Sequence, residues 1–172
     1  HLLVQLDGDD RKTLTAEYER IGKIVSDFGA LDVLVAEDRP SRDRIWEMRR
    51  CMADALTRMS PVREREDVVV PRAAIPALFR KLKGLSEKHG AEIISYGHIG
   101  DGNVHVNIMK QEMAPEAWER MLPILLDELF REVMALGGTI SGEHGIGYVK
   151  KKYLPLAVNA PALAMMKAVK QA

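Results

Sequence analysis

Apolar positions spaced three and four residues apart predict the helices of this chain. The predicted helices cover residues 13–28, 40–59, 75–90, 115–136 and 160–172, with a break or restart at Pro123. Short apolar runs beside turn residues predict strands at 2–6, 31–36, 67–71, 93–98 and 104–109, and a short extended segment at 139–141. This order of elements predicts an α+β fold in which an antiparallel sheet carries helices mainly on one face.

Charge and cysteine content exclude several classes of function. The chain has 172 residues, and its 25 basic residues balance its 25 acidic ones, so it lacks the basic surface that nucleic acids select. No apolar run is long enough to span a bilayer. The single cysteine, Cys51, excludes an internal disulfide and fits a reducing compartment, and its position in a helical stripe predicts a buried thiol. We expect one domain, with or without an attached helix, cut from a longer protein.

Two histidines flank a glycine-rich turn in the segment HIGDGNVHV, residues 98–106. Alternate side chains of a strand share a face, so His105 and Asn107 point to one side and their apolar neighbours to the other. A short turn between paired strands brings His98 and His105 to similar heights. Asp101, within the turn, is placed to fix the tautomer of a histidine. The segment therefore predicts two imidazoles that converge on one face of a hairpin.

A second glycine-rich segment, SGEHGIG at residues 141–147, adds Glu143 and His144. Two histidines and a carboxylate hold a divalent metal with open positions in catalytic zinc and non-haem iron sites. His144 would then remain for proton transfer. Each segment alone also fits a structural turn or a helix start. The two segments together hold three of the five histidines of the chain, which favours a metal or catalytic site.

HIGDGNVHVN and GGTISGEHGIG resemble the two signature segments of the C-terminal domain of FAD-linked oxidases. That family contains glycolate oxidase, D-lactate dehydrogenase and D-2-hydroxyglutarate dehydrogenase. RIWEMRR and REDVVVPRAAIP resemble earlier segments of the same domain, so the resemblance covers nearly the whole chain. It implies that residues 1–172 form a ferredoxin-like substrate and metal domain, truncated at both ends, whose FAD-binding domain is absent. It also implies oxidation of a 2-hydroxy acid of the glycolate or D-lactate type to the 2-oxo acid, with hydride passing to FAD.

The resemblance assigns the metal ligands and the base. His98, His105 and Glu143 match the ligands of a divalent ion, zinc in the first place and iron or manganese as alternatives. His144 matches the residue that takes the proton of the substrate hydroxyl as hydride leaves for the flavin. A metal-bound hydroxyl has a lowered pKa, so a neutral imidazole can remove its proton near neutral pH.

The resemblance also assigns the groups around the substrate. Arg49 and Asn107 match substrate-binding positions, and Arg65 stands where some members carry a substrate-binding lysine, although the two residue types are not interchangeable. The residues expected to hold these groups in place are Asp101, Asn103 and Lys150. YVKKKYL, which contains Lys150, also fits a solvated basic turn.

The expected partners are a small 2-hydroxy acid, the FAD-binding domain of the same full-length chain, and electron-transfer subunits. We expect a cytoplasmic protein, with the full-length complex either free or peripheral to the inner membrane, and no oxidase activity from this polypeptide alone. Two alternatives remain: a metal-dependent hydrolase that uses the same histidines and glutamate, and a non-catalytic α+β binding module. The apparent start inside a strand counts against a self-sufficient hydrolase, and the clustering of His and Glu counts against the module.

Overall fold

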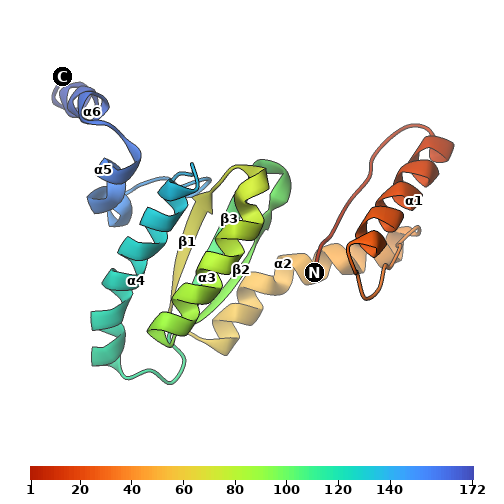
Figure 1. Cartoon of the computed structure of the whole chain (residues 1–172), viewed down its shortest axis with the longest axis horizontal. Coiled ribbons are helices and arrows are strands. Elements are labelled where there is room, and N and C mark those ends of the chain that lie inside the picture. The colour runs from red at the N-terminus through yellow and green to blue at the C-terminus, as the bar shows by residue number, and fades with distance from the viewer. The chain divides into compact units, whose positions relative to one another are not determined.

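The computed structural model describes all residues from 1 to 172. The chain divides into two compact units, residues 1–52 and residues 53–172. Figure 1 draws the elements of both, and each unit is described below by itself.

The first unit contains α1 (Arg11–Asp27) and most of α2 (Arg39–Met59). The carboxylate of Asp10 caps α1 by accepting hydrogen bonds from the backbone N–H groups of its first turn. Asp38 does the same for α2, where its side chain accepts from the backbone N–H of Ser41 at 2.8 Å. These contacts satisfy N–H groups that have no partner inside the helix.

Three predictions for the first unit are wrong. Residues 2–6 and 31–36 form no strand, because a short apolar run forms a strand only where another strand can pair with it, and this unit contains none. Cys51 is exposed rather than buried. Helical spacing shows which residues share a face, and it does not by itself show that the face is covered.

The second unit is built on a three-stranded antiparallel sheet. Its strands are β1 (Arg63–Val69), β2 (Glu92–His98) and β3 (Asn103–Met109), in the order β1-β3-β2. On the other edge of β1, Val69 pairs with Thr139 in a single antiparallel bridge. The unit therefore has the ferredoxin-like strand order with its last strand reduced to one bridge. The predicted α+β fold is confirmed.

Two helices cover one face of this sheet, α3 (Ile75–His89) and α4 (Pro115–Ala135) (Figure 1). The covered face carries alternate residues of each strand, and its centre is fully buried. The core residues that the strands supply are Val68, Val104, Val106 and Ile108, and those that the helices supply include Leu78, Leu82, Leu125, Leu129, Phe130 and Val133. The shorter elements are η1 (Arg72–Ala74), η2 (Ile99–Asp101), η3 (Val149–Tyr153), α5 (Leu154–Ala157) and α6 (Ala160–Gln171). No helix has the length and apolar character that crossing a membrane requires.

The break predicted at Pro123 is wrong, because α4 continues through it. Proline in a helix removes one backbone hydrogen bond and costs about 3 kcal/mol. A continuous buried stripe on α4, from Trp118 to Val133, packs on the sheet and on α3. Burial of several large side chains at about 1.5–3 kcal/mol each outweighs the cost of the proline.

Gly84 lies in the interior of α3, is exposed, and has no atom near the position that a Cβ would take. We expect Gly84→Ala to raise the free energy of unfolding by about 0.5–1 kcal/mol, because alanine loses less backbone freedom on folding. Urea denaturation measures this change. Gly102→Ala is the contrasting variant and should destabilise the chain, because Gly102 has φ +75° and its Cβ would overlap the carbonyl oxygen of Val70. Equal effects of the two variants would contradict this explanation.

Candidate functional site

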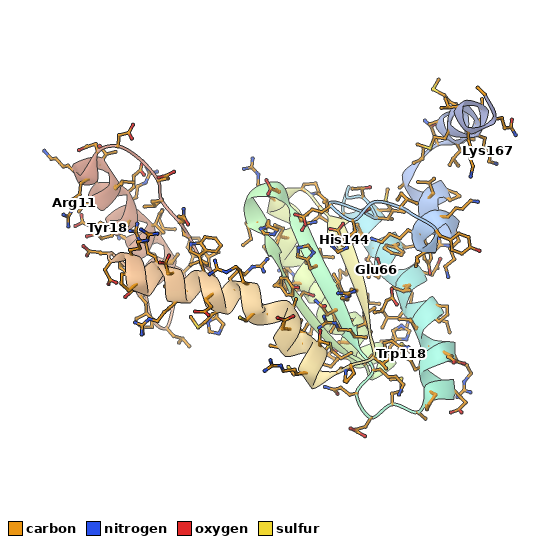
Figure 2. The ribbon with its side chains drawn as sticks, turned by 180° about the vertical axis from the view of Figure 1, so that it is seen from behind. Arg11, Tyr18, Glu66, Trp118, His144 and Lys167 are labelled. Carbon is orange, nitrogen blue, oxygen red and sulfur yellow. The ribbon has the colours of Figure 1, made fainter.

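The candidate site lies on the face of the sheet that α3 and α4 leave uncovered. Figure 2 shows this face turned toward the viewer. Residues directly paired across antiparallel strands share a face. The strand register therefore places three rows of side chains side by side on this face. The rows, each read from β1 through β3 to β2, are Val69, Asn103 and His98; Asp67, His105 and Tyr96; and Arg65, Asn107 and Ile94.

His98, His105 and Glu143 come together beside this face. Nε2 of His98 lies 3.9 Å from Oε1 of Glu143, and Nε2 of His105 lies 3.7 Å from Oε2 of the same carboxylate. One ligand atom from each of the three residues lies within 4.8 Å of the other two. Two ligands bound at about 2.1 Å to a tetrahedral zinc ion lie roughly 3.4 Å apart, so a small closure would complete such a site. The donor set fits a divalent metal.

The two histidines differ in burial. The side chain of His105 is 14% exposed, against 45% for His98. Burial lowers the pKa of His105 below the usual histidine value, and the carboxylates of Glu143 and Asp67 oppose this effect only in part. A neutral imidazole is the form that binds a metal, so the protein holds His105 in that form near neutral pH.

His144 lies against His105 without joining the group of three. The two rings are stacked, with centroids 5.6 Å apart and planes inclined by 20°. His144 is exposed, in the loop that leads from the Thr139 bridge toward η3 (Figure 2). Its imidazole is therefore available to solvent and to a ligand at the site, as a group that exchanges a proton must be.

Asp67 anchors the loop that carries Glu143 and His144. Its Oδ2 accepts hydrogen bonds from the backbone N–H groups of Gly142, Glu143 and His144, at 3.0, 2.7 and 2.7 Å. Its Oδ1 accepts from the side-chain amide of Asn103. Burial alone would raise the pKa of the Asp67 carboxyl, but these hydrogen bonds outweigh burial and lower the pKa to about 2. Asp67 is therefore a carboxylate at every pH where the protein would work.

Glycine at position 142 permits this close approach. A Cβ there would overlap the Asn103 amide and lie 2.7 Å from the side chain of Val69. The loop backbone thus rests directly on the sheet, which sequence spacing does not reveal.

On the core face of β1, Lys150 makes a second attachment. Its Nζ lies 2.9 Å from Oε2 of Glu66 and donates hydrogen bonds to the backbone carbonyls of Asp67 and Ile140, at 3.2 and 2.9 Å. The Lys150 and Glu66 side chains are 7% and 1% exposed. Lys150 is thus buried, and the alternative of a solvated basic turn is wrong for it. The loop is held to β1 on both faces of the strand.

The predicted substrate-binding residues lie in different places. Asn107 stands next to His105 on the site face, and its side-chain amide donates to the carbonyl of Ile94 at 3.2 Å. Arg65 is directly opposite Asn107 and is exposed. Arg49 belongs to α2 in the first unit, so its part in substrate binding stays a prediction.

Of the residues expected to hold the site in place, Asn103 contacts Asp67 and is buried, whereas Asp101 is exposed in η2.

Sequence reasoning missed Asp67 and Glu66. A signal was present, because Glu66 shares its strand alternation with the buried Val68 and Val70. A strand extended upstream to include it would have predicted a buried carboxylate in need of a cation.

Comparison with known proteins gives a consistent result. The family model described as "FAD linked oxidases, C-terminal domain" matches residues 1–172. A D-lactate dehydrogenase of Anaerostipes hadrus is 30% identical over 171 residues, which are 99% of this chain and 36% of that protein. The glycolate oxidase subunit GlcD of Bacillus subtilis is 32% identical over 171 residues, with the same two shares. A D-lactate dehydrogenase of Archaeoglobus fulgidus is 37% identical over 150 residues, 87% of this chain and 31% of that protein. The chain thus spans about a third of the length of these relatives.

Proposed function

The chain belongs to the family of FAD linked oxidases, C-terminal domain, and we propose that it supplies the metal- and substrate-binding part of a flavin-dependent 2-hydroxy acid dehydrogenase. The substrate would be an acid of the glycolate or D-lactate type, oxidised to the 2-oxo acid. The observation that carries this proposal is the convergence of His98, His105 and Glu143, with His144 stacked beside them. Family membership favours it over the hydrolase and the non-catalytic module.

His144 would remove the proton of the substrate hydroxyl. Its ring is exposed and stacked on that of His105, so a hydroxyl placed at the three-residue group would lie beside its imidazole. A general base must come within hydrogen-bonding reach of the proton it removes. The place of His144 beside His105 and outside the group of three ligand atoms supports this role.

The substrate carboxylate would bind at the row of side chains next to the row that contains His105. Arg65 and Asn107 occupy neighbouring positions there on β1 and β3, and a guanidinium offers paired donors that match a carboxylate. Arg49 is the further arginine proposed for this task. On β2, Ile94 lies in the same row and Tyr96 lies in the row of His105, and both would contact the remainder of the acid.

Two groups bound to the protein would supply the rest of the chemistry. A divalent ion at His98, His105 and Glu143, zinc in the first place and iron or manganese as alternatives, would lower the pKa of a bound hydroxyl. FAD, held mainly by another domain of the full-length protein, would accept the hydride. The proposed partners are that FAD-binding domain and electron-transfer subunits.

Metal content tests the proposal. We expect the chain, purified without chelator or histidine tag and then supplied with zinc, to hold about one ion, and His98→Ala/His105→Ala to hold less than about a tenth of that. Elemental analysis measures the ions, and circular dichroism confirms that the variant is folded.

The matched control is His89→Ala. His89 pairs with Glu128, 3.1 Å away, at the end of α3, so its removal should leave the metal content unchanged. Equal metal in the parent and the double variant would show that the histidines only shape a turn.

A further inference from the structure

We propose that Asp67 is a positioning residue for the candidate metal site: its buried carboxylate fixes the backbone of residues 142–144 and so presents Glu143 and His144 before any ion binds. The inference concerns a residue that the motifs do not contain. It rests on the proposed function for the role of the metal, whereas the attachment itself can be tested without metal.

Asp67 is not placed to be a ligand. Its side chain has no solvent exposure, and both of its oxygens already accept hydrogen bonds from protein donors. Oδ2 receives three backbone N–H groups, and Oδ1 receives the Asn103 amide. A carboxylate saturated in this way has little capacity left for an ion. Its effect on the site must act through the groups that it holds.

The groups that it holds would otherwise be free to move. Glu143 is 53% exposed, and its loop contains Gly142, Gly145 and Gly147, of which the last two have positive φ. Fixing the backbone of one residue costs roughly 1–2 kcal/mol in conformational entropy, and glycine loses more than any other residue. If that ordering had to accompany metal binding, it would weaken the affinity. Three N–H groups on one carboxylate oxygen order the loop during folding instead.

The attachment also fixes the side of the sheet on which the loop with Glu143 and His144 lies. The N–H groups of Glu143 and His144 both point at Oδ2 of Asp67, each at 2.7 Å. Asp67 is the β1 neighbour of His105 across the sheet. The loop is therefore held to the row of side chains that contains the more buried of the two histidines. Together with the attachment through Lys150, this contact sets where the backbone of Glu143 and His144 lies relative to His105.

Asp67→Asn isolates this role. The variant is almost isosteric, but its amide nitrogen must face either the three backbone N–H groups or the Asn103 amide, and both sides present donors. We expect zinc affinity to fall about 10–100-fold, as is typical when an outer partner of a metal ligand is lost. Isothermal titration with zinc alone measures it. In metal-free protein, we expect the amide hydrogens of Glu143 and His144 to exchange at least about tenfold faster, as NMR would report.

Two control variants separate positioning from general stability. Val106→Ala removes buried volume from the core face of the central strand, where Val106 has no exposure, and it should destabilise the fold while leaving zinc affinity within about twofold. Asp127→Asn makes the same chemical change on α4, which covers the opposite face of the sheet and where Asp127 pairs only with Arg131 of its own helix. It should leave zinc affinity within about twofold and stability almost unchanged. A loss of affinity in Val106→Ala equal to that in Asp67→Asn would reduce Asp67 to an ordinary stabilising residue and overturn the proposal.

The two readouts also separate this proposal from the function on which it rests. If the parent chain binds no zinc, the proposed metal site fails, and amide exchange alone decides the role of Asp67. Faster exchange confined to residues 142–144 in Asp67→Asn would then still support the attachment. Unchanged exchange in that variant would refute it, whatever the metal measurement gives.

Discussion

In a flavoprotein that carries this domain, His144→Gln should lower kcat for oxidation of the 2-hydroxy acid by about 10²–10⁴-fold, the usual contribution of a general base. The glutamine keeps a polar side chain of similar reach but cannot take up a proton. His144 lies outside the group of three ligand atoms, so the metal content should stay at the parent level. Because the proposal assigns binding of the hydroxyl and the carboxylate to other residues, KM should change far less than kcat.

Steady-state kinetics and elemental analysis of the same preparations test this expectation together. His89→Gln makes the same substitution at a histidine that pairs with Glu128 at the end of α3, and it should leave both kcat and metal content unchanged. If His144→Gln retains the parent kcat, another group removes the proton. If it loses its metal as well, His144 supports the ligands and the proposed division of roles is wrong.

The site could be predicted from sequence only as far as local rules reach. His98 and His105 flank a turn between two strands that pair directly, so alternation and register were enough to bring them together. Glu143 and His144 are adjacent in sequence, but the backbone that carries them is attached to the sheet by long-range hydrogen bonds to Asp67. No periodicity encodes that contact. The sequence joined the two segments only through their shared histidines, carboxylates and glycines and through the family resemblance.

The same distinction separates the correct from the wrong elements of the fold. Strands β2 and β3 were predicted within a residue or two, because each has a partner close in sequence. The strand predicted at 67–71 instead begins at Arg63. The prediction missed its first half because the residues there are charged and form no apolar run. Those charged residues include Glu66, which faces the core and is neutralised by Lys150 from 84 positions later. Burial of a charge can be recognised only when its partner is known.

Lys150→Met should lower the free energy of unfolding by about 3–5 kcal/mol at neutral pH, the usual cost of leaving one member of a buried ion pair without its partner. Methionine matches much of the volume of the lysine stem, so the main loss is electrostatic. The variant leaves Glu66, whose side chain is 1% exposed, without its cation. It also leaves the carbonyls of Asp67 and Ile140 without their donor. Urea denaturation measures the change.

Lys151→Met is the matched control, because Lys151 is exposed on the same short helix. A substitution at such a surface position usually changes stability by less than about 0.5 kcal/mol. A similar loss in both variants would mean that lysine at position 150 acts through general features of the loop rather than through Glu66.

The pH dependence identifies Glu66 as the cause. Burial raises the pKa of Glu66, Lys150 opposes this rise, and the nearby Glu64 and Asp67 carboxylates add to it. A group with a raised pKa in the folded state binds its proton more tightly there than in the unfolded chain, so its ionisation destabilises the fold as pH rises. Without Lys150 the pKa of Glu66 rises further, and the deficit of Lys150→Met should therefore shrink as pH falls toward the ordinary glutamate pKa. The double variant Glu66→Gln/Lys150→Met no longer carries the buried carboxylate. It should recover most of the lost stability at neutral pH, and its remaining deficit should not change with pH.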